Sequence, residues 1–469
     1  MTASAVPTAT DASGRELAAA YAAGELSPVA VATEVLDDID RRNGVINAFS
    51  DLHREATLAD ARASEERWAH GEQRGPLDGV PVTVKENFHR VGIDAFAGVA
   101  GGVPVRADRD APAVERLTEA GAVIVGSTTM PDWGMLSSGV SSRWGVTRSP
   151  WNPEWTVGGS SAGAGAAAAA GFGVFHLGTD IGGSVRLPAA WTGTASLKPS
   201  NGRIPIDNPY LGRAAGPIAR RVEDLALAMT AVSRPDSRDF TSLPPADLDW
   251  LGLDVDVRGA RIALHLDAGA GTPVDAEVAA AVRAAADVFA AAGAEVVELA
   301  PFIDDHHLVD IDDFWRVRFW RTFAAMSHEA RSGVLPYIAE WVHPGADMSG
   351  RRALEAYETI ADLQRATVLA TEGFDAVLSP VAPMAAFPAE WPMPWGDDAS
   401  VAMAHIGFTL PYNMSGQPAA SVNCGFTSDG RPIGLQVSGR RFADVETLRY
   451  TAWYEAARPE SAVPAFPRG

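Results

Sequence analysis

The chain of 469 residues contains 38 lysines and arginines against 59 aspartates and glutamates, which gives a formal net charge of −21. With this acidity and no basic stretch, nucleic acid and anionic membranes are not expected partners. The single cysteine, Cys424, excludes an internal disulfide framework and a cysteine-based zinc site. No apolar run approaches the roughly 20 residues that span a bilayer, and residues 1–10 lack the basic flank and apolar core of a secretory signal. We therefore expect a soluble cytoplasmic protein.

Helical signals dominate the first 75 residues. Ser13 and Glu16 have the spacing of a capping box, and Ser27 before Pro28 is typical of an N-cap and the first helical position. Further helices are expected at about Ala111–Ala120, within the Gly/Ala tract Gly158–Gly171, and at Val274–Ala292. The predicted strands, most of them short apolar runs, are Val80–Lys85, Ala122–Gly126, Gly173–Gly178, Arg261–Leu266, Glu295–Leu299, Ala376–Ser379, Ala420–Cys424 and Gly434–Val437.

This alternation of strands and helices predicts α/β layers. The least regular pattern lies at about Phe302–Asp398, and no internal repeat is present. We expect one domain over residues 1–469. Its expected parts are N-terminal helices at about 10–75, a core at about 76–300, a variable pocket region at about 301–400 and a return to the core at about 401–460.

Lysine is rare in this chain, because only Lys85 and Lys198 interrupt the use of arginine. An arginine cannot lose its proton at any useful pH, whereas a buried lysine can become a neutral amine and accept one. Base composition of the gene can account for the arginine excess. It does not explain why Lys85 ends an apolar run, where no solvated cation is expected. We therefore favour a functional role for Lys85 over a buried structural ion pair.

Two glycine-serine turns carry the chemistry, Gly158–Gly163 and Gly178–Arg186. Consecutive glycines let several backbone N–H groups point at one spot, which is what a developing oxyanion requires. Ser184 directly follows two such glycines and is placed to be a nucleophile, but a serine hydroxyl needs a base to take its proton. Of the ten histidines only His176 lies near these turns, inside an apparently buried strand. Lys85 is the remaining candidate base.

These motifs resemble the amidase signature family in order and spacing. The resemblance rests on Gly79–Asn87, Gly158–Gly163 and Gly178–Pro188, with Ser184 standing 24 positions after Ser160. It continues through Ser196–Arg203, Gly216–Arg220, Asn413–Pro418 and Gly434–Gln436. It covers about residues 10–460. It implies the amidase signature fold, a single large α/β domain with a mixed, mostly parallel central β-sheet flanked by helices.

The resemblance also implies roles for individual residues. Ser184 would be the acylated nucleophile, Lys85 the base, and Ser160, whose peptide bond is typically cis in this family, the proton relay between them. The oxyanion hole would consist of the N–H groups of Ile181, Gly182, Gly183 and Ser184. Supporting side chains would be those of Ser161, Asp180 and Arg186. Such a site needs no metal and no cofactor, and Lys198 would be structural.

The expected reaction is hydrolysis of a carbonyl C–N bond through an acyl-enzyme. Thirteen tryptophans favour an apolar or aromatic substrate, so we expect a small-molecule aryl amide or carbamate and a monomer or homodimer. The candidate pocket residues are Met130, Trp133, Tyr210, Leu211, Trp315 and Phe319. Ala162 stands where the family usually has glycine and could tighten the turn that presents Ser160. Alternatives are the glutaminase subunit of a tRNA-dependent amidotransferase and a non-catalytic binding module.

Other motifs compete for the same residues. Gly159–Gly163 also fits the nucleophile elbow of α/β-hydrolase esterases, which needs a preceding strand and a late histidine such as His405. Gly163–Ala168 fits a dinucleotide fingerprint, which likewise needs a preceding strand. Ser160 and Ser161 could simply cap the following helix. The group Asp304–His307, with Asp310, Asp312 and Asp313, could hold a metal, although an acidic first helical turn explains it better.

Overall fold

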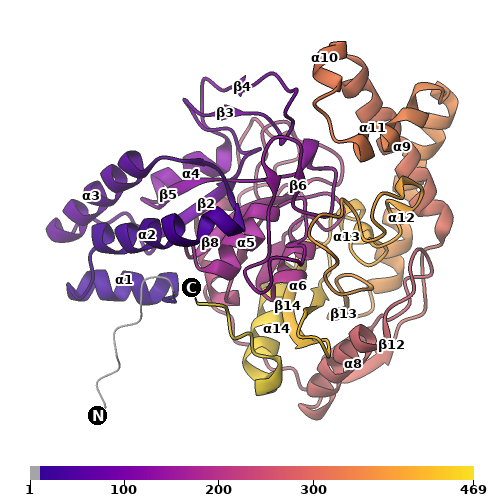
Figure 1. Cartoon of the computed structure of the whole chain (residues 1–469). Helices are drawn as coiled ribbons and strands as arrows, with labels where there is room; N and C mark the ends of the chain where they lie inside the picture. Colours follow the sequence, from indigo (N-terminus) through magenta and orange to yellow (C-terminus); the bar gives the residue numbers. More distant parts are fainter. Residues whose placement is uncertain (1–10, 469) are drawn as a thin grey trace.

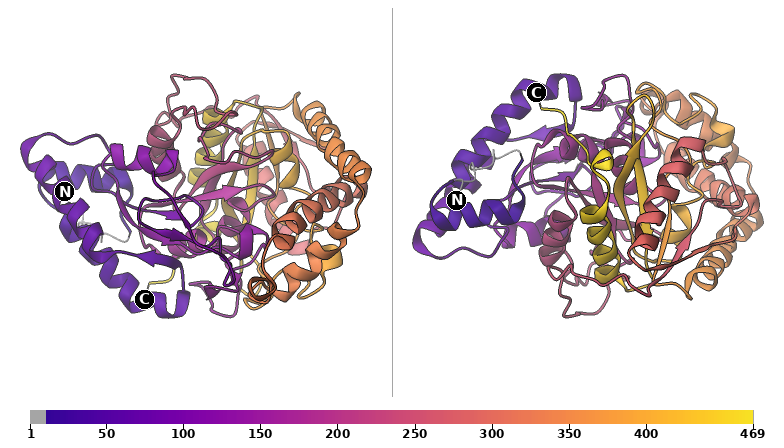
Figure 2. Two further views of the ribbon diagram at one scale, coloured as in Figure 1. Left: turned by 90° about the horizontal axis from the view of Figure 1, so that it is seen from above. Right: turned by 90° about the horizontal axis from the view of Figure 1, so that it is seen from below.

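The computed structural model describes residues 11–468, so residues 1–10, where no secretory signal was expected, lie outside it. Within residues 11–468, one continuous sheet has eleven strands, and helices surround it (Figures 1 and 2). The predicted α/β fold with a mixed sheet is confirmed. In spatial order the strands are β1 (Phe49–Leu52), β5 (Val123–Thr128), β2 (Pro81–Lys85), β8 (Phe175–Asp180), β10 (Ala214–Ala219), β9 (Ala195–Lys198), β14 (Ala419–Phe426), β15 (Pro432–Ser438), β13 (Ala376–Pro380), β11 (Arg261–Leu264) and β12 (Glu295–Glu298).

The sheet is mixed, but the expectation that it is mostly parallel is wrong. Parallel pairing is confined to two blocks, β5–β2–β8 and β13–β11–β12. Every neighbouring pair from β8 across to β13 is antiparallel, as is β1 with β5. The hairpin between β14 and β15 shows one reason, since a turn of a few residues can join only antiparallel strands.

Strands β9 and β10 account for much of this difference, because their sequences do not indicate strands. Both are buried along their whole length. Strand β10 contains Gly216 and Pro217, and Pro217 stands opposite Leu177 in the pairing with β8. A proline cannot donate to the ladder, so its presence argues against a central strand, and the packing of the sheet overrides that preference here.

The N-terminal helices α1 (Gly14–Ala23), α2 (Pro28–Ile46) and α3 (Arg54–His70) lie at one end of the molecule, in indigo in Figure 1. The capping box of α1 is confirmed: Ser13 Oγ accepts the N–H of Glu16, and the Glu16 carboxylate accepts the N–H of Ser13. Ser27 caps α2 through the N–H of Ala30, with Pro28 as the first helical residue.

Helix α5 (Ala162–Ala170) is fully buried between the sheet and its neighbours. Its small residues are required by close approach, because a Cβ at Gly163 would lie 2.1 Å from the carbonyl oxygen of Ala48. The predicted helices at 111–120 and 274–292 are confirmed as α4 and α8. The helices that flank the sheet are α4 (Pro112–Glu119), α5, α6 (Arg186–Thr192), α7 (Val222–Val232), α8 (Ala276–Ala291) and α14 (Asp444–Ala457).

At the opposite end from α1–α3, residues 302–371 form helices around one side of the molecule, in orange in Figures 1 and 2. The sequence pattern is least regular at about 302–398, and the structure divides this range, because most of residues 305–371 is helical. Residues 381–398 are largely irregular, as expected. The helices of this end are α9 (Asp305–Ala324), α10 (His328–Arg331), α11 (Pro336–Val342), α12 (Gly350–Thr371) and α13 (Leu410–Met414).

Short elements complete the fold. Two small antiparallel ladders are β3 (Asp94–Ala95) with β4 (Val105–Arg106), and β6 (Val140–Ser141) with β7 (Gly145–Val146). The 3-10 turns are η1 (Asp132–Gly134), η2 (His343–Ala346), η3 (Ala399–Val401) and η4 (Glu460–Ala462). Over residues 11–468, no helix combines the length and the apolar character that a membrane span requires.

Candidate active site

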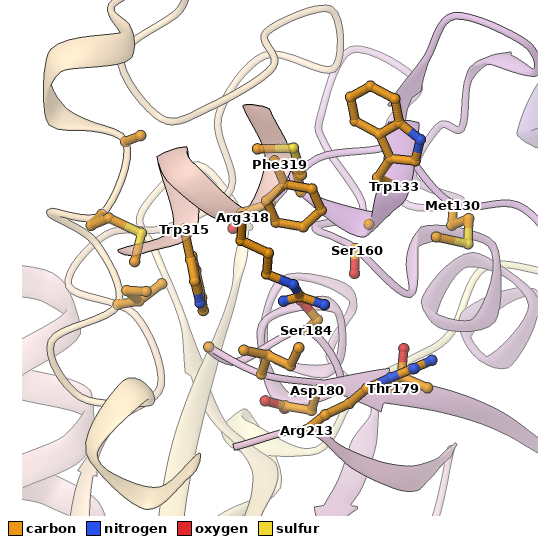
Figure 3. A pocket seen from close by; sticks show the side chains of 18 of the residues that line it. Met130, Trp133, Ser160, Thr179, Asp180, Ser184, Arg213, Trp315, Arg318 and Phe319 are labelled. Carbon is orange, nitrogen blue, oxygen red and sulfur yellow. The ribbon is translucent and has the colours of Figure 1, made fainter. Parts of the chain in front are cut away.

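A cavity of about 280 Å³ opens beyond the carboxyl ends of the parallel strands β2 and β8. Its wall includes Ser160 from the turn before α5, Thr179 and Asp180 at the end of β8, and Ser184 from the following turn (Figure 3). Ligands of α/β proteins commonly bind at this edge of a sheet. The two glycine-serine turns singled out by the sequence therefore meet at one cavity.

Lys85 is fully buried at the last position of β2, next to this cavity. Its Nζ atom lies 2.9 Å from Ser160 Oγ, 3.2 Å from Ser161 Oγ and 3.2 Å from Thr179 Oγ1. Among residues 11–468 it forms no ion pair with a carboxylate. The structure therefore does not support the alternative role of Lys85 as a partner in a buried ion pair.

The hydrogen bonds around Lys85 fit a neutral amine. Burial lowers the pKa of Lys85 well below its ordinary value, and the positive charge of Arg213 lowers it further, against the opposing effects of Asp180 and Glu86. The hydroxyl of Ser161 donates to the carbonyl of Thr179, so its oxygen can accept an N–H of Lys85. This leaves the nitrogen lone pair free to accept the hydroxyl proton of Ser160.

Ser161 is locked into the sheet rather than used as a helix cap. Its Oγ atom accepts the backbone N–H of Thr179, and it makes no capping bond to α5. The peptide bond between Gly159 and Ser160 is cis, as the family resemblance implied. The methyl group of Ala162 is buried in an apolar cluster with Phe49 and Val157, so the departure from glycine is accommodated with the Ser161 contacts in place.

Asp180 shapes the turn that presents Ser184. Its carboxylate accepts the backbone N–H of Gly183 (2.7 Å) and of Val185 (3.0 Å). The N–H of Gly183 is therefore already bonded and does not belong with the other predicted oxyanion donors. In the described part of the chain no hydrogen bond occupies the N–H groups of Ile181, Gly182 and Ser184, which remain available.

Arg186, the first residue of α6, holds the Asp180 side chain in place. The two fully buried side chains form an ion pair at 3.0 Å. Burial alone would raise the pKa of Asp180, but the charge and hydrogen bonds of Arg186 outweigh it and hold this pKa far below its usual value. The guanidinium also donates to Asn413 Oδ1 and Gln436 Oε1. Sequence reasoning gave these two no role, although both lie in motifs that carried the family resemblance.

The rest of the cavity wall is largely apolar. Met130 and Trp133 line it from the loop around η1, and Trp315 and Phe319 line it from α9, as predicted (Figure 3). The ring of Trp133 stacks on that of Phe319 at 6.3 Å. Tyr210 and Leu211 are not part of this wall: the ring of Tyr210 packs under the guanidinium of Arg318, and Leu211 is 42% exposed.

Several lining residues were missed by sequence reasoning. Asn87 donates to Thr179 Oγ1, and the guanidinium groups of Arg213 and Arg318 reach the cavity from different elements. Asn87 follows Lys85 by two residues inside a recognised motif, which was a usable signal. No comparable signal marks Arg213 or Arg318, because the chain contains many arginines.

The competing motifs do not build alternative sites. A nucleophile elbow and a dinucleotide site both need a strand directly before the motif. No strand leads into Ser160 or α5, because residues 147–161 are a loop with isolated bridges. His405 lines the cavity but pairs with Ser137 at 2.7 Å, and burial lowers its pKa to about 3. His176 is buried in β8 against Thr83, also with a pKa of about 3.

The acidic group around residue 304 is a helix start. Asp304 accepts the N–H of His306 and forms a capping box with His307 at the N-terminus of α9. The ligand atoms of Asp304, His306 and His307 do lie within 4.8 Å of one another, but two of the three residues are exposed. Asp310, Asp312 and Asp313 pair with arginines: Asp310 and Asp313 with Arg352, and Asp312 with Arg316. The cap and these ion pairs account for the carboxylates.

A model of the family described as Amidase matches residues 30–448 of the chain. The chain belongs to the amidase signature family. It is 34% identical over 456 residues to an acylamidase of Rhodococcus erythropolis, covering 95% of each chain. It is also 33% identical over 466 residues to a glutamyl-tRNA(Gln) amidotransferase subunit of Chloroflexus aggregans, covering 93% of this chain and 94% of the relative.

Solved structures agree with this membership. A bacterial aryl acylamidase of the same family superimposes with a TM-score of 0.87 at 28% identity, covering 98% of both chains. A 6-aminohexanoate cyclic dimer hydrolase with bound substrate gives a TM-score of 0.86 at 27% identity, covering 96% of this chain and 98% of that one. This amidase is therefore an amide-hydrolysing enzyme with the family fold.

Proposed function

We propose that this amidase hydrolyses the carbonyl C–N bond of an aryl amide or aryl carbamate through Lys85, Ser160 and Ser184. The observation that carries the proposal is the 2.9 Å contact between Lys85 Nζ and Ser160 Oγ, beside a cavity that Ser160 and Ser184 both line. A buried amine next to a hydroxyl can serve as a general base, because burial favours its neutral form. No metal or cofactor enters this mechanism.

The proton moves in one direction to form the acyl-enzyme and returns to release the amine. Neutral Lys85 takes the hydroxyl proton of Ser160 while Ser160 takes that of Ser184, and Ser184 Oγ bonds to the carbonyl carbon. The N–H groups of Ile181, Gly182 and Ser184 stabilise the tetrahedral oxyanion. The proton then passes back to the leaving nitrogen and the C–N bond breaks. Water, activated by the same groups, hydrolyses the ester on Ser184.

Support for an aryl substrate comes from the apolar wall. Trp133, Trp315 and Phe319 line the cavity, and an aromatic substrate ring can make offset-stacked or edge-to-face contacts with such side chains. The names of two relatives, an acylamidase and an aryl acylamidase, point to the same class of reaction. Small aliphatic amides would leave this wall unused.

A glutaminase subunit of a tRNA-dependent amidotransferase is the second candidate, because relatives named as amidotransferase subunits match the chain almost as well. Free glutamine carries an α-ammonium group that needs an acceptor. Among the residues that line the cavity, the one carboxylate is that of Asp180, which is already paired with Arg186. The lining thus favours a substrate without an ammonium group. Hydrolysis of anilides, and not of glutamine, by the purified single chain would support the first candidate.

Labelling with a fluorophosphonate tests the mechanism directly. We expect intact-mass spectrometry to show one added group per chain, and peptide mapping to place it on Ser184. The Ser184→Ala variant should stay unlabelled and lose turnover of 4-nitroacetanilide by roughly 10⁴-fold or more, as for other serine nucleophiles, with an unchanged circular dichroism spectrum. A label on another serine, or turnover by Ser184→Ala within tenfold of wild type, would refute the proposal.

A further inference from the structure

Among the residues that the structure describes, two arginines of the cavity wall have no carboxylate within ion-pair distance, although the charge of Asp239 acts on Arg213 from further away. Arg213 precedes β10 and donates to the carbonyl oxygen of Asn208, and Arg318 lies on α9 over the ring of Tyr210 at 3.5 Å. Nearby arginines are paired, for example Arg316 with Asp312 at 2.7 Å. In residues 11–468, neither Arg213 nor Arg318 forms an ion pair.

The two guanidinium groups act on each other and on the reaction centre. Burial and then the charge of Arg318 lower the pKa of Arg213 to about 10, against the smaller opposing effect of Asp239, so the two guanidinium groups are close enough to repel. Both line the same cavity as Ser184 (Figure 3). Two like charges that are partly buried and unpaired are costly to keep together. An anion bound between them would offset that cost.

The charge of the cavity is opposite to that of the protein. The whole chain has a formal net charge of −21. The ionised side chains of the cavity lining are Arg213, Arg318 and Asp180, and the last is neutralised by Arg186. The uncompensated charge that a bound substrate meets is therefore positive, beside an aromatic wall formed by Trp133, Trp315 and Phe319.

We propose that the substrate of this amidase carries a carboxylate in addition to its scissile amide or carbamate, and that Arg213 and Arg318 bind that carboxylate. This inference rests on the proposed function for the site at Ser184, whose chemistry it does not alter. Planar guanidinium groups bind carboxylates through paired, charge-assisted hydrogen bonds. The carboxylate sits on either the acyl or the amine half of the substrate, and the two halves are tested separately.

Matched substrate pairs test the proposal on both halves. For the acyl half, N-phenylsuccinamic acid is compared with its neutral carboxamide isostere through the release of aniline. For the amine half, 4-acetamidobenzoate is compared with 4-acetamidobenzamide through the release of acetate. In at least one pair we expect kcat/KM for the carboxylate to be roughly 10- to 100-fold higher, the range of charge-assisted hydrogen bonds.

Arginine variants then assign the preference to its residues. Arg213→Met and Arg318→Met should each reduce the carboxylate preference to within about threefold, with Arg318→Lys in between because it keeps the charge but loses the planar fork. Arg351→Met is the control, because Arg351 is an exposed arginine of α12 that pairs with Glu355 and lies outside the cavity lining. It should leave the ratio unchanged.

Measurements of substrate binding test the carboxylate preference without requiring turnover. The same four compounds are titrated into the Ser184→Ala variant by calorimetry, where tighter binding of a carboxylate supports the inference even if all four are poor substrates. Equal binding and equal kcat/KM within both pairs would overturn it, as would a preference that survives both Arg213→Met and Arg318→Met. If neutral anilides are cleaved by wild type and not by Ser184→Ala while no preference exists, the proposed function stands and this inference fails.

Discussion

The two walls of the cavity are held by different forces. The polar wall consists of side chains fixed by buried hydrogen bonds, with Lys85 against hydroxyl groups and Asp180 against Arg186. The opposite wall is one face of α9, where partly buried rings such as Trp315 and Phe319 are held by packing. Under the proposed mechanism, reaction geometry and substrate choice thus belong to separate parts of the molecule. Changes to the polar wall should abolish chemistry, and changes to α9 should alter which substrate is accepted.

The largest effect on this comparison is expected at Lys85. Lys85→Arg keeps a positive charge but cannot supply a neutral amine, so kcat should fall by at least about 10³-fold. The measurement is single-turnover acylation by an anilide.

Lys198 is the matched control for Lys85. It is also fully buried in the same sheet, with burial lowering its pKa to about 7, but its Nζ donates to the carbonyl of Pro199 outside the cavity lining. Lys198→Met should reduce kcat by less than about tenfold, since it removes no group that meets substrate. Equal losses in the two variants would show that a buried lysine matters here only for folding.

The next largest effect is expected from Arg186→Met. It leaves the fully buried Asp180 without its counter-charge, which should lower the free energy of unfolding by about 3–5 kcal/mol. We also expect kcat to fall by roughly 10²-fold in the folded enzyme, because the turn that presents Ser184 loses its anchor. Urea denaturation and kcat below the unfolding transition measure the two effects. Arg258→Met, which breaks an exposed ion pair with Asp256, should change neither; if it has the same consequences, the anchoring role is refuted.

A smaller and selective effect is expected from Trp315→Ala. A Cβ on Gly182 would lie 3.3 Å from the Trp315 ring, so the indole covers the turn before Ser184. Losing it should raise KM for anilides about tenfold and leave acetamide hydrolysis nearly unchanged. Trp320→Ala is the control, because Trp320 lies on the same helix as Trp315, packs against His343 of η2 and does not line the cavity. Equal losses for anilides and acetamide would contradict a role in substrate choice.

The smallest expected effect is a shift in the pH dependence of activity, caused by the charge of Arg213 acting on Lys85. The proposed base Lys85 must be neutral to take a proton, so kcat/KM should rise with pH through its lowered pKa and then level off. Arg213 helps to lower that pKa, against the opposing charges of Asp180 and Glu86. Arg213→Met should therefore raise the pKa of Lys85 and move the acid limb to higher pH, by a fraction of a pH unit. Arg351→Met should not move it, and a limb that stays in place in Arg213→Met would mean that another group titrates.

Much of the polar wall could be predicted from the sequence, because local patterns carry its chemistry. Glycines fix the turn before Ser184, and an apolar run that ends in Lys85 places an amine in a buried strand. The capping serines Ser13 and Ser27 likewise fixed where the first two helices begin. In each case the deciding interactions join residues a few positions apart, or follow from burial alone.

The rest depended on contacts between distant segments. The antiparallel centre of the sheet includes β9 and β10, where Pro217 contradicts local preference and only pairing with β8 decides the outcome. The N–H of Gly183 donates to Asp180 and is therefore not free to join the proposed oxyanion donors.

The sequence by itself pointed to the groups that we propose do the chemistry, because a lysine at the end of a buried strand and two glycine-serine turns stand out as local patterns. Only the tertiary structure showed which side chains form the rest of the cavity around those groups. The positive cavity beside the aromatic wall arises where α9 and the segment before β10, about 100 residues apart in the chain, bring Arg318 and Arg213 together. The local sequence does not distinguish either arginine from the many others in the chain, because the effect of a charged side chain depends on the groups that the fold places around it.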